Sequence, residues 1–371
     1  MKATLKKHII NARGSRLKEK YIIFESDDWG AIRIPNNQTR KALLKKGLIR
    51  DSDPFSRFDG LETTNDYLAL FEVLNKFKDS KGNHPVITAN FILNNPDFTK
   101  ISQGKFQKYH SESFLQTYKN YSGSEKAWDA LKEGLENKFL VPQFHGSEHL
   151  NVVRWMKYLK SKDERFLFAF TQNCFAIDEL GSHNRRENLM AAYDYNSHEE
   201  LDFIKSSISR GLKQFEDIFG FKSKTNIAPC YVWDKKVEQE LLSGGVKGIQ
   251  GSYLQNIPIP GKEFKKKYRY TGQKNIDNQC YFVRNGLFEP SIMTNVDWVS
   301  KCMQSIEIAF KWGKPAIIGT HRINFTGRLS REQRDKNLKM LEQLLFEIHK
   351  KWPEVNFTDS ASMLQKYNQY N

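Results

Sequence analysis

Short apolar stretches alternate with longer amphipathic stretches along most of this 371-residue chain. The apolar stretches predict buried strands, and the amphipathic ones carry apolar residues at helical spacing. Strand-then-helix repetition favours a parallel sheet covered by helices, either open or closed into a barrel. Composition agrees, because 39% hydrophobic and 27% charged residues are typical of a globular protein with an ample core.

The expected elements begin at residue 21. Strands are predicted at 21–25, 85–93, 139–144, 166–170, 226–229, 246–249 and 316–319. Helices are predicted at 67–77, 127–137, 198–219, 235–242 and 330–352. No linker-like or low-complexity stretch divides them, so we expect a single α/β domain over 21–365 after an N-terminal extension of residues 1–20. Long insertions are expected near 95–125, 173–196 and 251–290.

Two carboxylates follow the first predicted strand. The apolar run at 21–24 leads into Ser26-Asp27-Asp28-Trp29-Gly30, so both acids would emerge where that strand ends. The carboxyl ends of parallel strands are where α/β enzymes place their chemistry. Seen alone, an Asp-Asp pair after a strand more often caps a helix.

Two imidazoles lie four residues apart in His145-Gly146-Ser147-Glu148-His149, directly after the strand predicted at 139–144. This separation would put both on one side of a helical turn or helix start, as a chelating pair needs. Two His and one Asp would make a metal site with open positions. The remaining Asp could then handle a proton.

The net charge of +15 makes an anionic partner worth considering. The densest basic runs lie at 41–50 and 261–269. They are read as solvated surface, as contacts to a phosphate-bearing substrate, or as peripheral contacts to an anionic membrane surface. Nucleic acid is not an expected partner, because no zinc finger, RNP-like strand or recognition-helix pattern occurs.

The four cysteines show no C-x-x-C pair and no regular spacing, so neither a thiolate zinc site nor a disulfide framework is indicated. Residues 1–20 are basic but lack the apolar segment of a secretory signal, and no apolar run reaches 18 residues. We therefore expect a cytoplasmic protein.

Five motifs occur in the order typical of the polysaccharide deacetylase family, also called the NodB-homology domain or carbohydrate esterase family four, which the chain resembles. They are Asp27-Asp28, His145 to His149, the Pro-containing segment 227–231, Asp297-Trp298 and Gly319-Thr320-His321. The resemblance implies a deformed (β/α) barrel with a divalent metal, usually zinc. It implies Asp28, His145 and His149 as the metal ligands.

The resemblance also implies the roles of the remaining site residues. Asp27 would be the general base, His321 the general acid, and Asp297 the residue that orients and charges His321. The oxyanion would lie between the metal and the backbone N–H of Cys230. Tyr231 and Arg322 are further expected substrate contacts.

One departure from the family's pattern concerns the base. Ile227 stands where the family usually has an arginine that pairs with the catalytic Asp. Another cation, such as Arg33 or Arg322, would have to hold Asp27, or the base would be held less well. His183, in the second insertion, could touch substrate and is not predicted as a ligand.

The function expected from these residues is metal-dependent removal of an N-acyl group from a sugar, or a related amide or ester hydrolysis. The expected substrate is an intracellular nucleotide- or lipid-linked precursor of a surface polysaccharide. Three alternatives remain: a zinc peptidase of the H-x-x-E-H type with Glu148 as base, a non-haem Fe(II) oxygenase, and an inert carbohydrate-binding protein.

Overall fold

The computed structural model describes residues 2–177, 186 and 188–369. Its main sheet has the strand order β10-β7-β6-β5-β2-β1-β12-β11, and β13 pairs with the start of β1. Every pairing in this sheet is parallel. The strands are β1 (Tyr21–Trp29), β2 (Ile87–Ile92), β5 (Leu140–Gly146), β6 (Thr225–Ile227), β7 (Gly248–Gly251), β10 (Cys280–Val283), β11 (Gly286–Leu287), β12 (Ala316–His321) and β13 (Asn356–Phe357).

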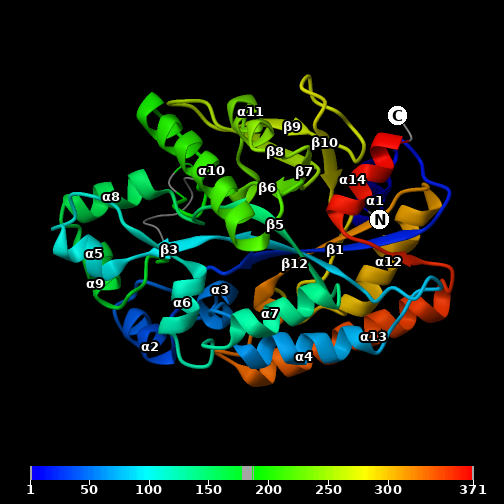
Figure 1. The fold of residues 1–371 in the computed structure, drawn as a ribbon, viewed down its shortest axis with the longest axis horizontal. Coiled ribbons are helices and arrows are strands. Elements are labelled where there is room, and N and C mark those ends of the chain that lie inside the picture. The colour runs from blue at the N-terminus through cyan, green and yellow to red at the C-terminus, as the bar shows by residue number, and fades with distance from the viewer. Residues whose placement is uncertain (1, 178–185, 187, 370–371) are drawn as a thin grey trace.

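Helices cover the outside of this curled sheet (Figure 1). Neighbouring helices pack in the order α7, α4, α13, α12 and α1 along one side, while α10 packs on β5 and against α11. The helices are α1 (Lys2–Asn11), α2 (Asn37–Lys45), α3 (Pro54–Phe58), α4 (Thr64–Asn75), α5 (Phe98–Gln103), α6 (Phe114–Asn120), α7 (Ala127–Glu136), α8 (Val152–Lys160), α9 (Glu164–Thr171), α10 (His198–Phe219), α11 (Lys235–Ser243), α12 (Trp298–Lys311), α13 (Arg331–Lys351) and α14 (Ser360–Gln369). The predicted α/β fold, a deformed (β/α) barrel, is confirmed.

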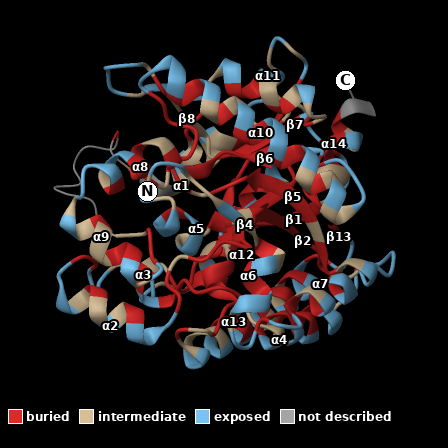
Figure 2. Cartoon of the chain, turned by 60° about the vertical axis from the view of Figure 1, so that its left-hand side comes forward, coloured by how far each residue is buried: buried red, intermediate tan, exposed pale blue. Residues whose placement is uncertain are grey.

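The central strands are buried along their length, and the exposed residues lie on the outer faces of the helices (Figure 2). Both faces of such a parallel sheet are covered, so its strands carry few exposed positions. The inner face also holds a buried polar cluster, in which Gln250 donates to Asn90 at 3.0 Å and to Thr225 at 2.8 Å. The interior of the sheet therefore contains buried polar side chains that satisfy one another.

The two edges of the sheet, β10 and β11, are consecutive in the chain. Only Arg284 and Asn285 separate them. The backbone N–H of Arg284 donates to the carbonyl of Gly251, the last residue of β7, at 2.9 Å, while the N–H of Asn285 donates to the carbonyl of Ile317, in β12, at 3.0 Å. The chain itself thus bridges the seam between the two edges.

Most predicted elements are present within a few residues of their expected ends, but the strand predicted at 166–170 is wrong. That stretch lies in helix α9, which Asp163 caps by accepting from the backbone N–H of Arg165. Its buried residues are Phe166, Ala169 and Phe170, spaced three and four apart as on one face of a helix. This short apolar run is therefore compatible with the repeat of a strand and with the repeat of a helix.

Two of the predicted insertions contain small antiparallel sheets. The stretch 95–125 holds α5, α6 and a pairing of β3 (Asn94–Pro96) with β4 (Ser111–Ser113). In the stretch 251–290, β8 (Leu254–Ile257) pairs with β9 (Lys265–Tyr268), but β10 and β11 belong to the main sheet. In the described part of the chain, no helix has the length and apolar character needed to cross a membrane.

Candidate metal centre and active site

A break in the regularity of β1 turns its two acids toward one cavity. The register of β1 against β2 shifts between Ser26 and Trp29, and Asp28 has a φ of 74°. Such left-handed backbone is uncommon for a residue other than glycine and is often found at functional sites. A bulge of this kind redirects side chains that a regular strand would point to opposite faces.

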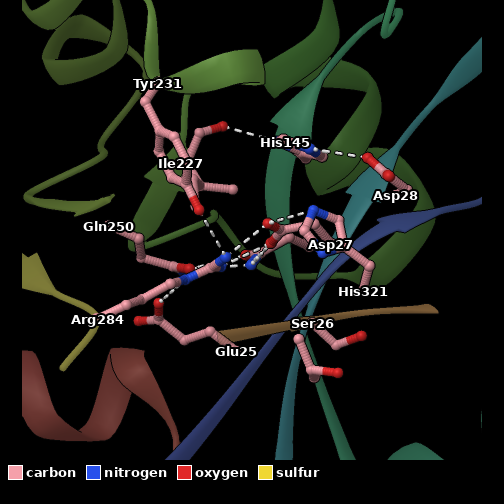
Figure 3. Close-up of polar contacts among 12 residues, drawn as sticks. Glu25, Ser26, Asp27, Asp28, His145, Ile227, Tyr231, Gln250, Arg284 and His321 are labelled. Atoms are coloured by element: carbon pink, nitrogen blue, oxygen red, sulfur yellow. Dashed lines mark hydrogen bonds and ion pairs between the residues drawn. The ribbon is translucent and has the colours of Figure 1, made fainter. Parts of the chain in front are cut away.

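Asp28, His145 and His149 form the expected donor cluster. The Oδ1 atom of Asp28 lies 3.2 Å from Nε2 of His145 and 3.3 Å from Nε2 of His149. One donor atom from each residue lies within 4.8 Å of the others. The Nδ1 atom of His145 lies 2.8 Å from the carbonyl oxygen of Ile227, which leaves Nε2 directed at Asp28 (Figure 3). An imidazole anchored in this way is typical of metal ligands.

The protonation states also suit a metal. Burial opposes ionisation of Asp28, but a hydrogen bond from His145 and the positive charge of His321 help to hold the pKa of that carboxyl well below its usual value. Burial lowers the pKa of His149 to about 4. A carboxylate and a neutral imidazole are the forms that ligate a cation, so these donors fit a divalent metal, and their nitrogen and oxygen set suits zinc.

The histidine pair does not lie on the helical turn or helix start that its spacing predicts. His145 is in β5, and His149 lies in the loop before α8. The residue between them, Glu148, points elsewhere: its carboxylate accepts from Oγ of Ser207 on α10 at 3.1 Å, and burial raises its pKa to about 7. Since the H-x-x-E-H peptidase motif requires a helix, the structure does not favour that alternative.

Asp27 is held by Arg284, which the sequence analysis missed. The Nη1 and Nη2 atoms of Arg284 donate to the two carboxylate oxygens of Asp27, each at 2.7 Å, and Nε donates to Glu25 at 2.8 Å (Figure 3). Burial would raise the pKa of Asp27, but the guanidinium outweighs it and lowers that pKa. For Glu25 burial prevails and raises the pKa. The positive charge of Arg284 is therefore directed mainly at Asp27.

His321 is paired with Glu289, and the prediction that Asp297 orients it is wrong. The Nδ1 atom of His321 lies 2.7 Å from Oε1 of Glu289, and its Nε2 atom lies 3.8 Å from Oδ2 of Asp27. Burial alone would lower the pKa of His321, but the carboxylates of Glu289 and Asp27 raise it to about 10. Asp297 is instead the exposed N-cap of α12 and accepts from the backbone N–H of Ser300.

Arg322 is not a substrate contact. Its side chain is fully buried, with Nη1 2.6 Å from Glu62 and Nε and Nη2 each 3.1 Å from Asp59. The expectation that Arg33 or Arg322 holds Asp27 is also wrong, because Arg284 occupies that place. Through these two carboxylates, Arg322 holds the loop between α3 and α4 against the core.

The Pro-containing segment forms a tight turn beside the donor cluster. Cys230 and Tyr231 have φ angles of 55° and 56°, so the backbone here is left-handed at two consecutive residues. The hydroxyl of Tyr231 lies 3.4 Å from Nη1 of Arg284, and burial raises its pKa to about 12. The role of the Cys230 N–H at an oxyanion stays a prediction.

A cavity of about 300 Å³ joins these groups. Its described lining residues are Asp27, Asp28, Arg33, Phe55, His145, His149, Asn188, Met190, Ile227, Ala228, Cys230, Tyr231 and His321. Asn188 and Met190 come from the insertion at 173–196, while His183 lies outside the described residues. A larger cavity of about 710 Å³, which includes Tyr21 and Val86, lies at the opposite ends of the strands.

Arg284 and Glu289 were detectable by the pattern that identified the other site residues. Each follows a short strand of the main sheet, Arg284 after β10 and Glu289 after β11. The apolar run at 280–283 followed by Arg284 resembles the run that precedes Asp27 and Asp28. Both residues lie in the stretch 251–290, which is predicted to be an insertion.

Comparisons with known proteins give distant structural similarities. No family model matches the chain, and no curated protein matches it in sequence. A putative polysaccharide deacetylase from Mycobacterium smegmatis is 8% identical with a TM-score of 0.45, covering 97% of this chain and 96% of that one. Puue allantoinase is 10% identical with a TM-score of 0.46, covering 94% and 90%.

A 4-alpha-glucanotransferase from Thermococcus litoralis is 10% identical with a TM-score of 0.44. The alignment covers 95% of this chain, which spans 40% of the length of that enzyme. At this distance the similarities assign no activity to this chain.

Proposed function

We propose that this chain is a metal-dependent hydrolase of the polysaccharide deacetylase type that removes an N-acyl group from a sugar. The observation that carries the proposal is the convergence of three metal donors, Asp28, His145 and His149, on one cavity. Asp27 and His321 line the same cavity, and each has a charged partner behind it. This combination supplies a cation site, a base and an acid within reach of one substrate bond.

The metal, for which zinc is the best match, would be held by the carboxylate of Asp28 and by Nε2 of His145 and His149. When bound, such a cation acidifies a water molecule and polarises an acyl carbonyl. Three protein ligands would leave coordination positions open for the water molecule and for the acyl carbonyl. The carbonyl contact of Ile227 to His145 Nδ1 keeps that ring oriented.

The protein's own groups then move the protons. Asp27, oriented by Arg284, accepts the proton of the attacking water as that water adds to the acyl carbon. His321, charged through Glu289, donates its Nε2 proton to the leaving amine nitrogen as the carbon–nitrogen bond breaks. The Cys230 N–H is proposed to donate to the developing oxyanion. Acid and base keep different protonation states because Arg284 and Glu289 shift their pKa values in opposite directions.

The substrate is proposed to be an acylated sugar of the cytoplasm, linked to a nucleotide or a lipid as a precursor of a surface polysaccharide. The net charge of +15 supports a phosphate-bearing substrate or a peripheral contact with an anionic membrane. The four cysteines form no disulfide, as is usual in reducing compartments.

Release of acetate from acetylated nucleotide-sugars and lipid-linked sugars tests this function. The assay compares zinc-loaded protein with protein treated with a chelator, and with the His149→Ala variant. Chelator-sensitive release that His149→Ala abolishes supports the proposal. Sugar binding without release would favour an inert binding protein, peptide cleavage would favour the peptidase, and oxygen-dependent turnover would favour the oxygenase.

A further inference from the structure

Arg33 has no role in the proposed proton transfers, yet it lies at the site. Of the described residues that line the metal cavity, it is the one with an arginine or lysine side chain. It follows the Asp-Asp motif in the loop before α2, and its side chain is 18% exposed. Because Arg284 holds Asp27, Arg33 is not needed for the base.

A second cavity, of about 230 Å³, adjoins the metal cavity at Arg33. Both are lined by Arg33, Phe55, Asn188 and Met190. The other described lining residues of the second cavity are Arg50, Asp53, Ser56, Phe175, Ala176, Ile177 and Leu189. A substrate with its acyl group at the metal donors would extend past Arg33 into this space.

The charge of Arg33 is only partly compensated by its neighbours. Its Nη1 atom is 3.9 Å from the carboxylate of Asp59, whereas Arg322 contacts the same carboxylate at 3.1 Å. The guanidinium packs over the ring of Phe55, 4.5 Å from its centroid. That ring in turn meets His321 edge-on, with centroids 5.6 Å apart. Arg33 is therefore positioned by an aromatic ring, and this contact does not neutralise it.

Among the described lining residues of the second cavity, the one carboxylate is already occupied by other contacts. Asp53 is occupied as the N-cap of α3, where one carboxylate oxygen accepts from the backbone N–H of Ser56 at 2.8 Å and from its hydroxyl at 2.6 Å. Within the metal cavity, Asp27 is already paired with Arg284. Among the described lining residues of the second cavity, an incoming anion would thus meet the guanidinium of Arg33 and a carboxylate, Asp53, that is already occupied.

We propose that Arg33 binds an anionic group, a phosphate or a carboxylate, carried by the same sugar whose acyl group is removed. The inference rests on the proposed function and narrows its substrate to negatively charged acylated sugars. A guanidinium presents paired donors that match both oxyanions, and a prepositioned one loses little freedom on binding. Arg33 is a specificity-determining residue in this scheme.

Calorimetric binding to the zinc-loaded His321→Ala variant, in which the proposed proton donor is missing, tests the inference. The probes are N-acetylglucosamine, N-acetylglucosamine 1-phosphate and N-acetylmuramic acid, which carry no charge, a phosphate and a carboxylate. We expect one charged sugar to bind at least about tenfold more tightly than the neutral one, as for a hydrogen bond to a charged group. Whichever of the two charged sugars binds more tightly shows whether the anionic group is a phosphate or a carboxylate.

Adding Arg33→Gln should reduce this preference to less than about threefold, while leaving the Kd of the neutral sugar within about threefold. Arg57→Gln is the matched control, because it removes the same charge from an exposed residue outside both cavities. It should keep the preference. Arg33→Lys retains the charge but lacks the paired N–H donors of the guanidinium, so it should keep part of the preference for the charged sugar. This variant provides the test if Arg33→Gln does not fold.

Equal binding of all three sugars, or a preference that survives Arg33→Gln, would overturn the inference; the latter would assign the anion to the metal. Acetate release by the wild-type chain is scored separately. Absence of release contradicts the proposed function alone, whereas release without an Arg33-dependent charge preference contradicts this inference alone.

Discussion

Arg284 binds both carboxylate oxygens of Asp27, at 2.7 Å each, although the two residues lie 257 positions apart in the chain. The pair is buried, and Glu25 is bound to the same guanidinium. In the resemblance described above, an arginine at position 227 would have made this contact. Here the cation comes from the end of β10 and reaches the same carboxylate from another strand.

Arg284→Gln should move the acid limb of the pH–rate profile to higher pH. The guanidinium lowers the pKa of Asp27, so without it the base stays protonated, and inactive, up to a higher pH. Arg284→Lys, which retains the charge, should move the limb less. The measurement is kcat/KM against pH, with circular dichroism as a check on folding. An acid limb that stays in place in Arg284→Gln would mean that Asp27 is not the base.

His149→Ala should lose bound metal and activity together while the fold persists, because it removes one of three donors. Glu148→Gln is the control, since that carboxylate contacts Ser207 and is absent from the cavity lining. It should keep the metal. Elemental analysis of both purified variants decides the matter, and full occupancy in His149→Ala would refute the ligand assignment.

Asp27→Asn should keep the metal yet lower kcat by about 100-fold or more, as loss of a positioned general base does. Asparagine preserves the shape of the side chain but cannot accept the water proton. Metal content and kcat are measured on the same sample. Near-normal turnover would place the base elsewhere.

Glu289→Gln should move the alkaline limb to lower pH. The carboxylates of Glu289 and Asp27 raise the pKa of His321 to about 10, so the imidazolium persists at high pH, and removing Glu289 lets the ring lose its proton earlier. Asp297→Asn is the control, because that exposed cap does not contact His321. A limb that moves in Asp297→Asn and not in Glu289→Gln would restore the sequence-based assignment.

Arg322→Ala should destabilise the fold by about 3–5 kcal/mol, because it leaves the carboxylates of Asp59 and Glu62 buried without their cation. Urea unfolding followed by circular dichroism measures this loss. The refolded variant should still bind metal, since Arg322 is absent from the cavity lining. A free energy of unfolding equal to that of the wild type would contradict the structural role.

The sequence predicted the strands that carry the site because each is a buried apolar run followed by a polar residue. This held for β1, β2, β5 and β12. It failed at α9, where a five-residue run suited a strand and a helix equally. It failed at β10 and β11 because two short edge strands lie within a long irregular stretch, and their place in the sheet depends on contacts with β7 and β12 that are distant in sequence.

The donor residues were predictable, but the pairing of Asp27 and His321 with their charged partners was not. Asp27, Asp28, His145, His149 and His321 lie in short motifs and line one cavity as expected. Arg284 and Glu289 stand outside those motifs, and side-chain pairing across a barrel leaves no fixed spacing in the chain. Asp297 was assigned from its place in the motif order, whereas capping a helix is sufficient to explain it.

The segment that connects the two edge strands of the sheet also connects the proposed base, Asp27, with the proposed acid, His321. Arg284 and Glu289, five positions apart, flank the short edge strand β11. Amide contacts fasten this segment to β7 on one side and to β12 on the other. A displacement of residues 284–289 would move Arg284, the partner of Asp27, and Glu289, the partner of His321, at the same time. The acid and alkaline limbs of the pH–rate profile should therefore move together on substitution of Asn285, whose side chain hydrogen-bonds to Asn11, Pro315 and Ile317.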